Sequence, residues 1–503
     1  MEDIYPAGPV SVPDDLTRPT WAYKRQAWLA LAGLGTFMAL YLGLTAWFVW
    51  TAYRLFAAMA EGNGNFAGFM VASGAAFFAV FMLKALFFFR RGQEASANLE
   101  VTAAEQPRLF EFLHRLADEV RAPRPHRVFL SPSVNAAVFY DLSLFNLLWP
   151  SKKNLEIGLG LINVLTLGEI KAVLAHEFGH FAQRSMAVGR WVYVAQQIAA
   201  QIISRRDALD RFLAQLSRID LRVAWVGWIM QTVVWSIRSV METMFHGVVL
   251  AQRALSREME LQADLVAVSL TGSDALVSAL HRLHAADDAW ARTLNFARGE
   301  FGRGRPVADL FAVQTQIIGR LREILAQPDY GRVPPVPAEG RAAYRLFKAG
   351  LAQPPRMWAT HPANTEREEN AKRTYIHAAG DDREAWVLFG DAATLRRTMS
   401  LHLSREAKNE PAPVEDSLAR LDQDFNRLHL DRRYRGVFLG RSPVRHAASV
   451  DKLYGATPDP AGLAAELAAL YPDSLAQTLE RLRGLNEELQ ALQALRDRSA
   501  QAV

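Results

Sequence analysis

The chain has 503 residues, a length that predicts about two or three domains, and a formal net charge of only +5. Its Lys and Arg residues form no run interleaved with aromatic residues, so the sequence predicts no nucleic-acid partner. It contains no cysteine, which excludes disulfides, cysteine-ligated zinc and lipid attachment to cysteine. Hydrophobic residues make up 50% of the chain but are unevenly distributed, so their local pattern is more informative than their total.

The beginning of the chain predicts a short tail followed by a membrane hairpin. Residues 1–26 are polar and rich in proline and lack the features of a signal peptide, so we expect a retained tail. Residues 27–53 contain no charged side chain, and this run exceeds the roughly 20 residues that a helix needs to cross hydrocarbon. A second apolar run, 66–89, contains one charge, Lys84, close enough to its end to reach the headgroups. Together the two runs predict a transmembrane hairpin over residues 27–90.

Basic residues predict the orientation of this hairpin. Lys24 and Arg25 precede the first apolar run, and Arg90 and Arg91 follow the second. The connection over residues 61–65 contains neither Lys nor Arg. By the positive-inside rule both ends of the hairpin are cytoplasmic. We therefore expect an integral protein of the bacterial inner membrane whose following domain lies on the cytoplasmic side.

The residues after the hairpin predict a small sheet. Residues 107–121 have the pattern of an amphipathic helix, and residues 127–130 that of a short strand. Residues 154–160 alternate leucine and isoleucine with a second set of side chains on the other face. That second set is Glu156, Gly158 and Gly160. We expect a sheet edge here, where an extended substrate peptide could pair with the strand, although an ordinary core strand with turn glycines fits the pattern equally well.

A helix is predicted over residues 166–186. Thr166 and Glu169 have the spacing of a capping box, which starts a helix by satisfying two of its free backbone N–H groups. Apolar residues then recur at helical intervals. The sequence HEFGH therefore lies inside this helix rather than in a loop.

HEFGH places two candidate metal ligands and a candidate base side by side. His176 and His180 are one helical turn apart, so both imidazoles can reach one metal ion. Glu177 lies beside them, where it can act as a general base on water activated by the metal. The alternative is a chance occurrence on an ordinary amphipathic helix. The flanking residues are apolar, and burying these three groups without a metal would carry a desolvation cost.

A catalytic zinc needs a third protein ligand, for which Glu260 is the best candidate. Glu260 and Asp264 are four residues apart on a second predicted helix over residues 259–270, so they face the same way. One can bind the metal while the other accepts a hydrogen bond from a ligating histidine and fixes its tautomer. By itself this spacing is common on solvated helices.

Between the two helices lies an apolar insertion, residues 187–250. Because His180 and Glu260 must meet at one ion, the insertion crosses the membrane an even number of times. Two crossings would place several arginines outside, against the positive-inside bias. These are Arg205, Arg206, Arg211, Arg218 and Arg222. We therefore expect a helical hairpin lying against the cytoplasmic surface of the bilayer, with two further spans as the alternative.

The motifs together resemble a known family. VLAHEFGHF is followed downstream by SREMELQAD, Asn135 lies after a short predicted strand, and His361 and Arg367 form an HPxxxxR arrangement. This set resembles the HtpX-type and CAAX prenyl endoprotease family of integral-membrane zinc metallopeptidases. The resemblance spans residues 107–373 and the membrane hairpin, and the family commonly carries further spans in the region of the insertion.

The resemblance implies a zincin-like core that binds one zinc ion per chain. The implied ligands are His176, His180 and Glu260. Glu177 would be the base, and His361 would steady the tetrahedral oxyanion. From the sequence itself, His361 fits a simple turn at a helix start equally well.

Two charged residues are candidates for supporting the site. Asp264 would hold a ligating histidine. Arg367 could orient a carboxylate of the site, or it could be one more charge in a polar run.

Beyond residue 373 no chemical motif is found. Residues 474–496 predict a helix that starts with a Ser474/Gln477 capping box and carries a leucine stripe. The stripe lasts barely three heptads and is more typical of a packed helix than of a coiled coil. Self-association or a protein partner at these C-terminal helices stays open.

We thus expect a mainly α-helical protein with a small β-sheet, in which a zincin-like core rests on a transmembrane hairpin. The expected parts are the tail 1–26, the hairpin 27–90, the peptidase domain 91–380 with its insertion 187–250, and a helical C-terminal domain 381–503. The predicted function is a membrane-anchored zinc endopeptidase that cleaves membrane or membrane-associated proteins. The alternative is an inactive or latent peptidase fold that acts as a membrane scaffold through its C-terminal helices.

Overall fold

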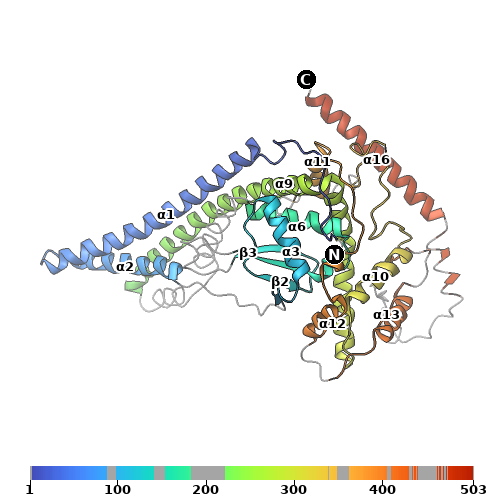
Figure 1. The fold of residues 1–503 in the computed structure, drawn as a ribbon. Coiled ribbons are helices and arrows are strands. Elements are labelled where there is room, and N and C mark those ends of the chain that lie inside the picture. The colour runs from blue at the N-terminus through green and yellow to red at the C-terminus, as the bar shows by residue number, and fades with distance from the viewer. Residues whose placement is uncertain are drawn as a thin grey trace.

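The computed structural model is mostly helical with one small mixed sheet, as the sequence predicts (Figure 1). It consists of an elongated helical arm and a compact part that contains the sheet. The residues that the structure describes are 3–87, 98–140, 153–182, 221–337, 339–347, 362–404, 409–429 and 474–501, together with isolated residues between 433 and 472.

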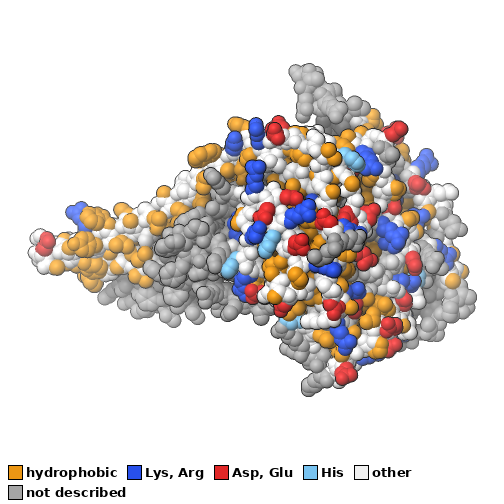
Figure 2. Space-filling view, in the orientation of Figure 1, with side chains coloured by type: hydrophobic (Ala, Val, Ile, Leu, Met, Phe, Trp, Pro, Cys, Tyr) orange, Lys and Arg blue, Asp and Glu red, His pale blue; other side chains and the backbone are white. Residues whose placement is uncertain are grey.

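The described residues of the arm belong to α1 (Trp21–Ala60), α2 (Phe66–Phe87) and the first part of α9 (Leu221–Gly302). They share an apolar core that is separate from that of the compact part, with the rings of Phe48 and Phe78 5.1 Å apart. Figure 2 shows hydrophobic side chains along the outside of the arm, and charged ones over the compact part. In the described part of the chain, these three helices are long and apolar enough to cross a membrane. The predicted hairpin therefore coincides with two candidate spans.

The insertion continues into the arm. From residue 221 it forms α9, which runs beside α1, with the rings of Phe37 and Phe245 5.9 Å apart. Residues 187–220 lie outside the described residues. Within residues 221–250 the structure places part of one helix that is long and apolar enough to cross a membrane. The choice between a surface hairpin and two further spans for the whole insertion stays a prediction.

The sheet has four strands in the order β1-β2-β4-β3: β1 (Leu99–Val101), β2 (Val128–Ser131), β4 (Lys153–Gly158) and β3 (Ala136–Tyr140). β2 and β4 are parallel, and the other two pairs are antiparallel. β4 is therefore an inner strand, so our prediction of a sheet edge at residues 154–160 is wrong. The described strands at the two edges are β1 and β3.

The alternation in β4 has a different physical cause. A Cβ atom on Gly158 would lie 2.1 Å from the carbonyl oxygen of Ser133, so only glycine lets the preceding loop approach. Gly160 lies beyond the strand, in α5 (Leu159–Ile162), and donates its N–H to the same carbonyl at 3.1 Å. Glu156 accepts a hydrogen bond from Asn98 at 2.9 Å. Glu156 and Gly158 thus make contacts within and beside the sheet, and Gly160 makes its contact from α5.

Helices cover the sheet and extend its core towards the C-terminus. The sheet side carries α3 (Pro107–Val120) and α6 (Leu167–Ala182); further along the chain come α10 (Leu310–Ile324), α11 (Asn364–Lys372), η1 (Ala385–Leu388), α12 (Ala392–Leu403) and α13 (Val414–Leu428). Phe311 of α10 packs between Trp290 and Trp386, with ring centroids 5.5 and 5.6 Å apart. Leu388, Met399 and other residues after 381 share one apolar core with α3 and α6. Described residues on both sides of residue 381 therefore share the core of the compact part.

The last helix, α16 (Ser474–Gln501), differs from our expectation of a packed helix. Its described leucines from residue 479 onward are about half exposed: Leu479, Leu482, Leu485, Leu489 and Leu492. The other described residues therefore leave the leucine stripe about half exposed.

The N-terminal tail packs across the compact part. Tyr5 and Leu16 are buried. The Nζ atom of Lys171 in α6 donates to the carbonyl of Pro6 at 2.7 Å, and Gln262 of α9 donates to the carbonyl of Thr17 at 2.5 Å. The tail thus joins α6 to α9 and leads directly into α1. It follows that the tail and the compact part lie on the same side of any membrane that α1 crosses.

Lys171 makes this contact testable through pH. Its side chain is almost fully buried, and burial lowers its pKa to about 8 from an ordinary 10.5. The folded chain therefore binds this proton less tightly than the unfolded chain, so stability should rise with pH between about 8 and 10.5. The rise is at most about 3 kcal/mol, at roughly 1.4 kcal/mol per pKa unit. Thermal unfolding of purified protein at several pH values should show it in the wild type and not in Lys171→Met. An equal rise in both proteins would contradict it.

Candidate metal centre

Local sequence explains why α6 begins where it does and how closely it meets α9. Thr166 donates its backbone N–H to the Glu169 carboxylate at 2.9 Å, and the hydroxyl of Thr166 accepts from the N–H of Glu169 at 3.3 Å. The predicted capping box is confirmed. Further along, a Cβ atom on Gly179 would lie 3.2 Å from the Cα atom of Ala263. The glycine of HEFGH therefore allows the close approach of the two helices.

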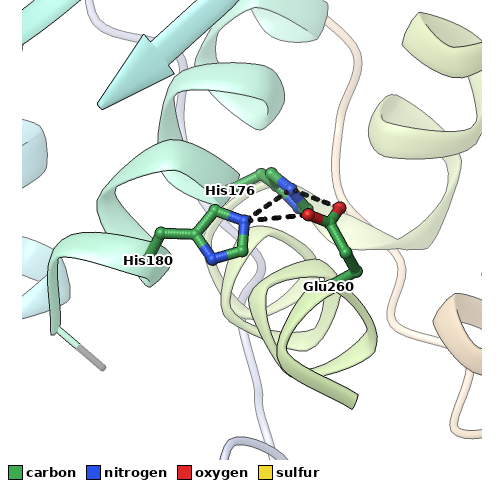
Figure 3. Close-up of side chains that lie close together, drawn as sticks. All are labelled: His176, His180 and Glu260. Carbon is green, nitrogen blue, oxygen red and sulfur yellow. Dashed lines mark hydrogen bonds and ion pairs between the residues drawn. The ribbon is translucent and has the colours of Figure 1, made fainter. Parts of the chain in front are cut away.

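This approach brings the two histidines of α6 to Glu260 of α9 (Figure 3). The Nε2 atoms of His176 and His180 are 3.2 Å apart. They lie 3.3 and 3.5 Å from the two carboxylate oxygens of Glu260. One ligand atom from each residue lies within 4.8 Å of the others. The structure thus brings together the three residues for which the sequence predicts metal binding.

The triangle of atoms fits a metal ion of the expected size. In a tetrahedral site with metal–ligand distances of about 2.0–2.1 Å, neighbouring ligand atoms are about 3.3 Å apart. Two imidazole nitrogens and one carboxylate oxygen are also a donor set that zinc accepts in catalytic sites. The described residues therefore fit a zinc ion with one position left open.

A buried pair of charges holds His176 in place. Oδ1 of Asp264 lies 2.9 Å from Nδ1 of His176, and Asp264 accepts from Nε of Arg367 at 2.9 Å. Burial alone would raise the pKa of Asp264, but the charge and hydrogen bonds of Arg367 outweigh it and lower the pKa. A hydrogen bond at Nδ1 leaves Nε2 of His176 directed towards Glu260. Of the two readings of Arg367, the structure supports the one in which it orients a carboxylate.

The carboxylates around His176 favour its positively charged form. Burial would lower the pKa of His176, but hydrogen bonds to Asp264 and Glu260 raise it to about 9. Burial also raises the pKa of Glu177, against the opposing effect of the two histidines. A carboxyl group with a raised pKa is suited to accept and then release a proton near neutral pH.

His361 lies outside the described residues, so its expected role stays a prediction. The sequence reasoning missed two contacts behind the site, those of Lys171 and Gln262 with the N-terminal tail. A lysine within the apolar stretch of α6 was the available signal, because a buried lysine needs a partner.

Comparison with known proteins decides the family. The model of peptidase family M48 matches residues 103–375, which is more than half of the chain. The chain belongs to peptidase family M48. The family match contains all three candidate ligands and confirms the resemblance found in the sequence.

Several similar proteins are named protease HtpX or protease HtpX homologue. The HtpX homologue of Nostoc punctiforme is 30% identical over 189 residues, which cover 37% of this chain and 59% of that protein. HtpX homologue 2 of Methanosarcina acetivorans is 28% identical over 184 residues, covering 36% and 57%. Each alignment spans less than two thirds of the relative. No solved structure matches the chain.

Proposed function

We propose that this M48 peptidase is a membrane-anchored zinc endopeptidase that cleaves peptide bonds on the cytoplasmic side of the membrane. The observation that carries the proposal is the triangle formed by His176, His180 and Glu260, with spacings suited to zinc. The buried ion pair of Asp264 and Arg367 supports this proposal, because Asp264 orients His176. Burying the two charges carries a desolvation penalty, which a role in holding the site would explain.

The chemistry requires one ion and one base. Zinc, when bound, would polarise the peptide carbonyl and lower the pKa of water. Glu177 takes a proton from the water that attacks the carbonyl carbon, and then gives it to the amine nitrogen as the C–N bond breaks. Asp264 keeps the proton of His176 on Nδ1, so that Nε2 keeps a lone pair for the metal. His361 remains our candidate for steadying the oxyanion.

The strand order of the sheet suggests where an extended substrate could bind. β3 lies against α6, and among the described strands only β4 pairs with it, so its other side could take an added strand. We propose that an extended substrate pairs there, in place of the strand that we expected from the sequence.

The second candidate function is a membrane scaffold with an idle or latent site. The exposed leucines of α16 favour it, since they offer an apolar surface that the described part of the chain leaves exposed. It predicts binding without cleavage.

Metal analysis of the full chain, purified in detergent, tests the proposal. We expect about one zinc per chain and cleavage of unfolded casein that stops when a chelator removes the zinc and returns when zinc is added back. Cleavage that continues after complete zinc removal would contradict the metal mechanism. Bound zinc without any cleavage would favour the scaffold.

A further inference from the structure

Ionisable residues occupy one face of α9 within the arm. Arg238, Glu242 and His246 follow one another at intervals of four residues, so they project from the same side of the helix. Glu242 and His246 are exposed, and the guanidinium of Arg238 lies 5.7 Å from the centre of the Phe81 ring in α2. Such residues are costly against hydrocarbon, and in membrane proteins they face the protein interior or a water-filled cavity.

The packing against α1 places this face deep in the arm. The two helices run antiparallel, because Gly33 lies against Val248 while Phe37, one turn further on in α1, contacts Phe245, which precedes Val248 in α9. By this register Tyr41 lies about level with Met241. Tyr41 is next to the centre of the uncharged stretch of α1. Glu242, next to Met241, therefore lies near the middle of the apolar part of the arm.

The same face leads to the metal centre. Glu260 follows Glu242 by about five helical turns, so the two carboxylates project from one side of α9, about 27 Å apart along its axis. Arg253 lies between them on the same side, about three turns after Glu242. The first break in the helix is at Gly272, beyond both of them. One continuous helix thus carries the ionisable face from the arm to the metal ligand.

Two other sides of this part of α9 are apolar. Ile237, Met241 and Val248 are buried against α1 and α2. Ile229 and Val240 are exposed hydrophobic residues on a third side, away from the ionisable face. The helix therefore has a separate surface suited to lipid.

We propose that Arg238, Glu242, His246, Arg253 and Glu260, together the polar face of α9, line a water-accessible path from the membrane to the metal centre. Its occupant is an extended segment of a membrane-embedded polypeptide. Arginine and glutamate alternate along it, which suits the paired donors and acceptors of a peptide backbone better than an ion of one sign. The polar face is also continuous with the metal site at Glu260. The role of the occupant as substrate rests on the proposed function, whereas the water access does not.

Thiol labelling tests the path without any need for proteolysis. Since the chain has no cysteine, Glu242→Cys and His246→Cys each introduce a single thiol, and Ile229→Cys and Val240→Cys are controls on the lipid side. In native membranes a water-soluble maleimide should label the first pair at least about tenfold faster, because a thiol ionises only where water reaches it. Equal, slow labelling at all four positions would overturn the proposal.

Cleavage then identifies the occupant. Glu242→Leu should lower the cleavage rate of a single-span test protein about tenfold and leave casein cleavage unchanged, while Val240→Leu should change neither. Unchanged cleavage of the single-span protein by Glu242→Leu would rule out a substrate path. If the wild type cuts neither protein, the proposed peptidase function fails, and the labelling result still decides whether water reaches the polar face.

Discussion

Glu177→Gln should lower the rate of peptide hydrolysis by about 100-fold to 10 000-fold, the range typical for loss of a general base. Glutamine keeps the shape of the side chain but cannot take a proton from the attacking water. The ligands His176 and His180 are untouched, so zinc should stay at about one per chain. Casein cleavage and elemental analysis of the same samples measure both quantities.

Cleavage rate and zinc content together separate proton transfer from metal binding at Glu177. Lost activity with retained zinc assigns Glu177 to proton transfer rather than to metal binding. Activity within about twofold of the wild type would remove Glu177 from the mechanism. Loss of zinc together with activity would instead mean that its carboxylate supports the metal.

Glu260→Ala should reduce the zinc content from about one per chain to nearly none, since it leaves only the two histidines of α6. Asp264→Asn should have a graded effect, with zinc affinity about 10-fold to 100-fold weaker, as found when a partner of a ligating histidine is changed. Asparagine can still contact His176 and Arg367, but it has no charge to balance the guanidinium. Competition with a chromophoric chelator gives both affinities.

The thermal midpoint of each variant serves as the control for folding. Asp264→Asn binding zinc as tightly as the wild type would show that the ion pair serves stability alone. Full zinc content in Glu260→Ala would exclude Glu260 as the third ligand.

The sequence predicts the site better than it predicts its surroundings. The spacing of His176 and His180 and the Thr166–Glu169 box are local features, fixed by the geometry of one helix. The contact between Glu260 and α6 is different, because the four-residue spacing of Glu260 and Asp264 does not specify which helix they face. For this contact the prediction needs the family resemblance.

Features that depend on distant packing were harder to predict. Gly158 looks like an open strand position, whereas it makes room for the loop at Ser133. The tail is polar and rich in proline, and its sequence gives no sign that its carbonyls accept hydrogen bonds from Lys171 and Gln262. In both cases the partner is a backbone carbonyl, which carries no sequence signature.

The unbroken course of α9 also limits how the protein can be truncated. Glu260 lies on a helix whose first half packs against α1. The N-terminal tail contacts both α9 and α6 before it leads into α1. Any soluble fragment made by deleting the arm would sever the helix within a few turns of the third ligand and remove the residues that brace it. The peptidase part therefore has no natural boundary at the membrane surface, and the smallest unit that preserves the ligand geometry includes the apolar arm.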